Sequence, residues 1–194
     1  LADFVVDFHS GGKTLDFLPF CCAHVLDDKE QQSRCIAAMK AFNAPHSVML
    51  LEIDAVNMYD TAAENMGKVF ISTELGGGGS TTAYTVEIAK KGIRNILRHA
   101  EIIKGDLEVD KTINLDMPDD NCYIFSESTG LVEHCVNLGD KVKVGQLIAK
   151  VHNIERTGAL PDEYHAKIDG VFTGKHFPGL IGNGDFLGVI AVPV

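Results

Sequence analysis

His9 stands directly after an apolar run at residues 3–8, which predicts that it lies at the C-terminal end of a buried strand. Proteins of the α/β class place their functional sites at such strand ends. A neutral imidazole is a good zinc ligand. Ser10 comes next, and Gly11 and Gly12 after it would let the backbone approach a ligand closely. The alternative for His9 is a histidine that is only hydrogen-bonded at the end of its strand.

Glu74 occupies a similar place, near the end of a run at residues 68–75 and before four glycines at 76–79. A carboxylate there can act as a general base toward a metal-activated water and pass the proton to a leaving nitrogen. The alternative is a carboxylate that pairs with an arginine or caps the next helix. The glycine run lacks the Gly-Lys-Ser/Thr ending of a phosphate-binding loop, so it predicts a flexible turn near the site.

Strands and helices alternate over the first hundred residues. Extended runs are expected at 3–8, 15–22, 47–53 and 68–75. Helices are expected from Asp27, with Glu30 completing a capping box, over 57–66, and from 80–82 to about 100. After Gly105 the helical period disappears and short β-like runs follow. We therefore expect an α/β sheet covered by helices over 1–105, a linker at 106–118, and a small all-β barrel or sandwich at 119–194.

The composition of the chain argues against some classes of binding partner. The chain has 194 residues with 17 Lys and Arg against 27 Asp and Glu, a formal net charge of -10. This balance argues against a nucleic-acid or anionic-membrane partner, which would need a basic face. The apolar stretches are too short to span a bilayer. Five cysteines without CxxC spacing predict free thiols in a reducing cytoplasm.

Two motifs resemble the aspartoacylase and succinylglutamate desuccinylase family of zinc amidohydrolases, which has a zinc-carboxypeptidase-like fold. Residues 5–12, Val-Val-Asp-Phe-His-Ser-Gly-Gly, resemble the strand that carries its third zinc ligand. Residues 70–77, Phe-Ile-Ser-Thr-Glu-Leu-Gly-Gly, resemble its catalytic-glutamate strand. The resemblance extends over essentially the whole chain. It implies a Zn²⁺ cofactor, His9 as a metal ligand, Glu74 as general base and then acid, and Ser10, Gly11 and Gly12 as pocket wall.

Within that family, residues 10–17, 73–79 and 155–158 are most similar to the deacetylases that act on N-acetyl-diaminobutyrate in ectoine breakdown. The resemblance implies removal of an acyl group, expected to be acetyl, from the amine of a small amino acid. Succinylglutamate desuccinylase or aspartoacylase activity is the alternative inside the family, and a homo-oligomer is left open. Arg156, in a polar loop, is a candidate for substrate binding, with a solvated loop charge as the alternative.

One departure from the family concerns the metal. The family holds zinc with a His-x-x-Glu pair upstream of the strand-end histidine, and only eight residues precede His9. The chain also opens at Leu1 in the middle of an expected strand. We therefore expect the C-terminal portion of an enzyme, lacking two zinc ligands and inactive alone. His152 and Glu155 have the same spacing, which we interpret as a coincidence because they follow His9 in the chain.

A non-enzymatic alternative rests on the β module. Its segment 139–149 resembles biotinyl and lipoyl carrier domains, which present a modified lysine on a tight turn. The nearest lysine, Lys150, stands inside an apolar strand without a turn around it, so the likeness is interpreted as shared barrel geometry. An inert scaffold is the remaining alternative.

Overall fold

The computed structural model describes residues 2–51 and 58–194. Contacts between residues divide the chain into two compact units. The first, which we call the α/β unit, comprises Leu1–His9, Pro19–Leu75 and Thr81–Asp116. The second, which we call the β unit, comprises Ser10–Leu18, Gly76–Ser80 and Met117–Val194.

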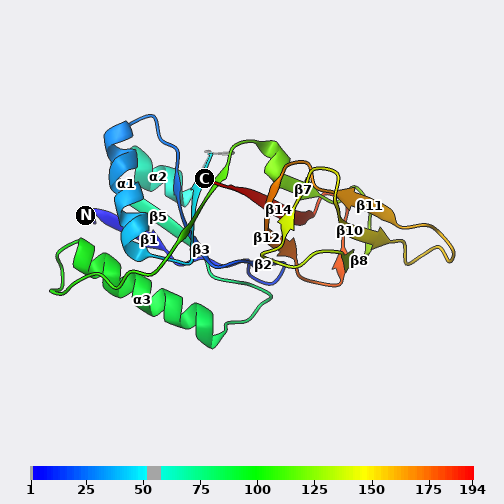
Figure 1. Ribbon diagram of the computed structural model, residues 1–194, viewed down its shortest axis with the longest axis horizontal. Helices are drawn as coiled ribbons and strands as arrows, with labels where there is room; N and C mark the ends of the chain where they lie inside the picture. The colour runs from blue at the N-terminus through cyan, green and yellow to red at the C-terminus, as the bar shows by residue number, and fades with distance from the viewer. Residues whose placement is uncertain (1, 52–57) are drawn as a thin grey trace. The chain divides into compact units, whose positions relative to one another are not determined.

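The α/β unit is built on a mixed sheet with the strand order β1-β5-β3-β4, and β6 Ile113–Met117 follows next to β4 (Figure 1). The strands are β1 Phe4–Asp7, β5 Val69–Glu74, β3 Phe20–His24 and β4 His46–Leu50. β1 is parallel to β5, and β3 is parallel to β4, whereas β3 and β5 are antiparallel. The C-terminal ends of β1 and β5 therefore meet at one edge of the sheet, beside the start of β3.

The described residues of this unit form the helices α1 Lys29–Phe42, α2 Tyr59–Asn65 and α3 Ala83–His99. The helix expected from Asp27 instead has Asp28 as its N-cap, because the Asp28 carboxylate accepts hydrogen bonds from the backbone N–H groups of Glu30 and Gln31. Thr82 caps α3 through a reciprocal bond with Thr85. The expected start of the second helix, Asn57, lies outside the described residues.

The two faces of the sheet differ in chemistry. Alternate residues of a strand point to opposite faces, and one face supplies Ile71 and Cys21 to a core shared with Phe42 of α1 and Ile96 of α3. The other face carries polar groups. Asp7, Ser72 and Cys22 occupy paired positions across β1, β5 and β3. α1 and α3 thus bury the apolar face. α2 packs on the opposite face, where the ring of Tyr59 lies edge-on to Phe70 and Glu64 Oε1 lies 3.0 Å from His24 Nδ1.

The β unit is a sandwich of two mainly antiparallel sheets. One contains β2, β12, β14 and β7 with β9 on β12, and the other has the order β11-β10-β8-β13. Phe172, Leu187, Ile190 and Ile148 form its fully buried core. Its strands are β2 Leu15–Phe17, β7 Tyr123–Phe125, β8 Gly130–His134, β9 Lys141–Val142, β10 Leu147–His152, β11 Asp162–His165, β12 Gly170–His176, β13 Leu180–Ile181 and β14 Phe186–Pro193, and η1 Asp120–Cys122 is a short 3₁₀ turn.

Two features of the chain path differ from the sequence-based expectation. The run at 15–22 is two strands, β2 and β3, because Pro19 between them has no N–H for a ladder. β2 pairs with β12 in the β unit, and the Leu18 N–H donates to Thr173 O at 2.8 Å. The stretch expected as a linker at 106–118 contains a strand, β6 Ile113–Met117. No helix among the described residues has the length and hydropathy needed to cross a bilayer.

Candidate active site

The parallel pairing of β1 with β5 brings His9 and Glu74 to neighbouring positions. Asp7 and Ser72 are the last paired residues of the two strands, and His9 and Glu74 each follow two residues later. The backbone of His9 is tied to the end of β5. Its N–H donates to Thr73 Oγ1 at 3.0 Å, and its carbonyl accepts from the Leu75 N–H at 3.0 Å. The structure therefore brings together the two residues that the sequence selected.

Glu74 has an unusual carboxyl group. Its Oε2 is buried and has no hydrogen-bond partner among the described residues. Burial, and secondly the negative charge of Asp7, raise the pKa of Glu74 to about 8. A buried polar atom without a partner is rare in folded proteins. This one marks a place where water, substrate or a cation would find a ready acceptor.

His9 presents its ring to solvent, with 59% of its side chain exposed. Nδ1 lies 3.4 Å from Asp7 Oδ2, so a carboxylate faces this ring nitrogen.

A complete zinc site needs more than His9. Catalytic zinc is held by three protein ligands, and no group of three His, Cys, Asp or Glu side chains within 2–51 and 58–194 is arranged to hold a metal ion. These residues therefore offer one candidate ligand, His9, and one candidate base, Glu74, and they do not by themselves form a zinc site.

Gly11 and Gly12 lie in the β unit with the glycine run that follows Glu74. The Gly11 N–H donates to Gly76 O at 3.0 Å, and the Gly79 N–H donates to Gly12 O at 2.6 Å. A Cβ added to Gly11 or to Gly77 would overlap the backbone of Leu15. The turn expected to be flexible is thus held by backbone hydrogen bonds and needs glycine for close approach. Ser10, half-buried, begins this segment.

Arg156 lies in the exposed loop between β10 and β11. Its backbone N–H donates to Asn153 Oδ1 at 3.0 Å, and this hydrogen bond shapes the loop. Arg156 itself is exposed.

His152, nearby on β10, has Nε2 2.6 Å from Glu133 Oε2. The carboxylate beside His152 thus comes from β8.

The sequence analysis did not predict that two further residues, Thr73 and Asp7, contact His9. Thr73 is fully buried, and its hydroxyl contacts both the N–H and the carbonyl of His9. Asp7 precedes His9 by two residues, the spacing that puts two side chains on one face of a strand. That spacing was the available signal for Asp7. Thr73 gave none, since its contact depends on strand pairing.

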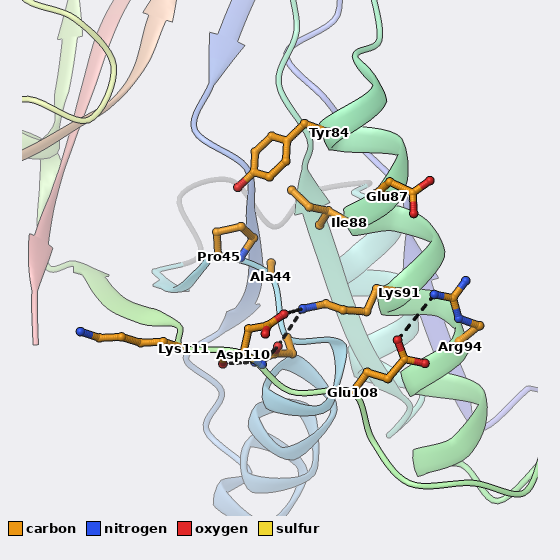
Figure 2. Close-up of a pocket in the computed structure, with 11 residues that line it drawn as sticks. Ala44, Pro45, Tyr84, Glu87, Ile88, Lys91, Arg94, Glu108, Asp110 and Lys111 are labelled. Carbon is orange, nitrogen blue, oxygen red and sulfur yellow. Dashed lines mark hydrogen bonds and ion pairs between the residues drawn. The ribbon is translucent and has the colours of Figure 1, made fainter.

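A cavity of about 420 Å³ elsewhere in the α/β unit contains none of the selected residues. Figure 2 shows Lys91 of α3 reaching Asp110, at 2.9 Å, and Arg94 reaching Glu108, at 3.7 Å. Asn43 accepts from the same Lys91 and ties the 110–112 segment to the end of α1. These charges serve mainly to hold the segment after α3 against the helices.

Lys150, the lysine of the carrier alternative, lies inside β10 and is paired on both sides, with β8 and with β11. Its Nζ is 3.4 Å from Glu163 Oε1. A carrier lysine must project from a turn to reach a partner enzyme. The position of Lys150 therefore gives the carrier alternative no support.

Comparison with known proteins gives a consistent set of relatives. The sequence of an N-alpha-acetyl-L-2,4-diaminobutyric acid deacetylase from Halomonas elongata is 49% identical over 193 residues, 98% of this chain and 56% of that protein. The product-bound structure of the ectoine utilization protein EutE (DoeB) from Ruegeria pomeroyi has a TM-score of 0.96 and 58% identity, covering 98% of this chain and 58% of that one.

A succinylglutamate desuccinylase from Silicibacter sp. TM1040 has a TM-score of 0.94 and 56% identity, covering all of this chain and 59% of that one. The chain thus spans 56% to 59% of the length of these relatives. The likeness confirms the expected α/β fold class. The sequence model of the succinylglutamate desuccinylase/aspartoacylase catalytic domain matches residues 1–100, just over half of the chain. The chain therefore belongs to the succinylglutamate desuccinylase/aspartoacylase family.

Proposed function

We propose that the protein containing this chain is a zinc-dependent deacetylase that removes acetyl from an amine of N-acetyl-2,4-diaminobutyrate, in ectoine degradation. The observation that carries the proposal is Glu74, beside His9 at one edge of the sheet, whose buried Oε2 has no hydrogen-bond partner in the part of the chain that the structure describes. The relatives support the substrate, because a deacetylase for this compound is 49% identical and an ectoine utilization protein is 58% identical.

Glu74 would move the proton in this reaction. It would accept a proton from the attacking water as the water oxygen adds to the amide carbon. It would then return that proton to nitrogen as the C–N bond breaks, which leaves acetate and a free amine. Burial raises the pKa of Glu74 in the metal-free chain. The positive charge of a bound zinc ion would lower it again, which favours the carboxylate that accepts the proton.

His9 would be one of the residues that hold the zinc ion, and the carboxylate of Asp7 lies 3.4 Å from its ring. When bound, zinc supplies Lewis acidity that polarises an amide carbonyl and makes water a stronger nucleophile. The other two ligands would come from protein outside the described residues. Without them we expect this chain alone to be inactive. Roles for Ser10, Gly11, Gly12 and Arg156 in substrate binding stay predictions.

We also propose that the enzyme acts in the cytoplasm on a small N-acyl amino acid, without a nucleic-acid or membrane partner. The net charge of -10 supports this, because a nucleic acid or an anionic lipid surface attracts basic faces. All five cysteines are free thiols, which fits a reducing compartment.

The substrate is tested with the full-length zinc-loaded protein and three compounds, N-acetyl-2,4-diaminobutyrate, N-succinylglutamate and N-acetylaspartate. We expect the first to have the highest kcat/KM. Preference for succinylglutamate would favour the second candidate, which the 56% identical desuccinylase supports. Turnover of none of the three would contradict a deacylase in this branch of the family. Removal of zinc by a chelator should abolish turnover, and added zinc should restore it.

A further inference from the structure

We propose that His176 is a pH-sensitive contact of the β unit, whose ring makes two hydrogen bonds when it is protonated and one when it is neutral. The inference is independent of the proposed function. It concerns a buried histidine that neither of the family motifs contains.

The ring of His176 joins three strands of the β unit. His176 is the last residue of β12, and only 3% of it is exposed. Its Nδ1 lies 3.2 Å from the carbonyl oxygen of Phe186, the first residue of β14. Its Nε2 lies 2.9 Å from the carbonyl oxygen of Leu180, the first residue of β13. A single side chain therefore ties the end of β12 to the starts of the next two strands.

Both partners of the ring are carbonyl oxygens, which accept hydrogen bonds and cannot donate them. A neutral imidazole has one N–H group, and a protonated imidazole has two. Only the protonated ring of His176 can therefore donate to both Phe186 and Leu180. In the neutral ring, one nitrogen turns its lone pair toward a carbonyl oxygen, and that hydrogen bond is lost. Uptake of a proton thus adds one bond between the strands.

The charged groups around His176 are compatible with a protonated ring. A buried charge is tolerated when it is hydrogen-bonded or paired. Asp185, in the turn before β14, lines the same small cavity of about 130 Å³ as His176 and brings a negative charge to it. Its Oδ2 accepts from the Gly182 N–H at 2.8 Å. Lys175 of β12 precedes His176 and is paired in the ladder with Asp16 of β2, which carries the opposite charge.

His134 of β8 is the titratable group that faces the backbone of His176. Its Nε2 lies 2.8 Å from the carbonyl oxygen of His176. Burial lowers the pKa of His134, which favours the neutral ring with its N–H donating to that carbonyl. Its Nδ1 is buried and has no hydrogen-bond partner within residues 2–51 and 58–194. Of these two neighbouring histidines, His176 is thus the one with acceptors for a second ring proton.

The contact is continuous with the turns that follow the candidate catalytic strands. Phe177 comes directly after His176, and its N–H donates to Thr14 O at 2.8 Å. A Cβ added to Gly78 would lie 2.6 Å from the Phe177 ring. Thr14 and Gly78 belong to the segments 10–18 and 76–80, which the β unit takes from the first half of the chain. A protonated His176 should therefore stabilise the loop that supports both segments.

The test uses the full-length protein over roughly pH 5–8, where histidines ordinarily titrate. Ring ¹H–¹⁵N spectra should show two N–H groups on His176 at the acidic end and one at the basic end. Hydrogen exchange, corrected for its intrinsic pH dependence, should show roughly 10- to 100-fold stronger protection of residues 177–186 at the acidic end. Residues 147–152 of β10 are the internal reference, because a change in global stability reaches both segments.

His176→Gln cannot take up a proton, so we expect it to lose the extra protection of 177–186 at acidic pH. His165→Gln is the matched control, because His165 is an exposed histidine on β11 of the same unit, and it should behave as the wild type.

A His176 ring whose number of N–H groups stays constant over this range would overturn the proposal. So would protection of 177–186 that changes no more than that of 147–152, or an extra change that persists in His176→Gln. If His176→Gln does not fold, the two wild-type measurements still decide the question.

Discussion

At the scale of single residues, the raised pKa of Glu74 should make the free energy of unfolding depend on pH. In the unfolded chain its pKa is near the ordinary value of 4.5, and in the fold it is about 8. Between these pH values the folded state keeps a proton that the unfolded state has released. The stabilisation from this group is therefore complete below about pH 4.5 and is lost as the pH rises to about 8.

This predicts a pH-dependent difference between the wild type and Glu74→Gln, which cannot ionise. In the metal-free protein, the free energy of unfolding of the wild type should fall relative to the variant by on the order of 4 kcal/mol across this range. Urea denaturation at a series of pH values measures it. Parallel pH profiles for the two proteins would show that Glu74 ionises normally and is not held in a buried site.

The positions of His9 and Glu74 could be predicted from the sequence, because each is a polar residue at the end of an apolar run. Such a run predicts a buried strand, and the polar residue then lies at the end of that strand. The structure agrees with these positions, while the roles of the two residues stay predictions. The buried Oε2 of Glu74 and its raised pKa could not be predicted. They depend on what packs around the carboxyl group, which residue order alone does not contain.

At the scale of elements, local signals located the helices and most strands of the α/β unit. They failed where neighbouring residues fit the local pattern equally well, or where the outcome depends on a distant part of the chain. Asp27 and Asp28 are both good N-caps, and the choice between them depends on which carboxylate reaches the N–H groups of the first turn. Pro19 marks the break within the 15–22 run, but the partner of its first half, β12, lies more than 150 residues away in the chain and has no local signal.

The crossing of α1 and α3 gives a prediction at this scale. Gly92 lies inside α3, and a Cβ there would overlap the ring of Phe42, which is fully buried. Gly92→Ala would gain about 1 kcal/mol of helix propensity, but we expect a net loss because overpacking a core typically costs about 1–3 kcal/mol. The measurement is the free energy of unfolding in urea.

Lys90→Ala is the control on the same helix, because Lys90 is exposed and its contact with Glu87 is a surface ion pair. This substitution should change stability by less than about 0.5 kcal/mol. A Gly92→Ala protein more stable than the wild type would mean that α1 and α3 do not approach as closely as the structure has them.

At the scale of the whole molecule, the chain crosses between its two units more than once. The segments Ser10–Leu18 and Gly76–Ser80 belong to the β unit, although they directly follow His9 and Leu75 of the α/β unit. The sequence divides the chain at a change of composition near residue 105. It could not reveal these two exchanges, because they arise from pairing between residues far apart in the chain.

The burial of the cysteines gives a prediction for the folded molecule as a whole. Cys21, Cys22, Cys35 and Cys122 are buried, and Cys135 is exposed. Burial also raises the pKa of the Cys21 and Cys22 thiols, which suppresses the reactive thiolate. Among these five, we expect a thiol reagent to modify Cys135 first in the native protein and all five after denaturation. Peptide mapping by mass spectrometry identifies the modified sites, and early labelling of Cys21 or Cys22 would contradict the fold.

The central claim is that Glu74 is the proton-transferring group of a zinc-dependent deacetylase. The most direct measurement is kcat for N-acetyl-2,4-diaminobutyrate, together with zinc content, in full-length Glu74→Gln, with Glu87→Gln of α3 as the surface control. We predict that kcat falls by roughly 10²- to 10⁴-fold in Glu74→Gln with its zinc content unchanged, and that Glu87→Gln behaves as the wild type. Turnover at the wild-type rate in a zinc-loaded Glu74→Gln protein would contradict the account.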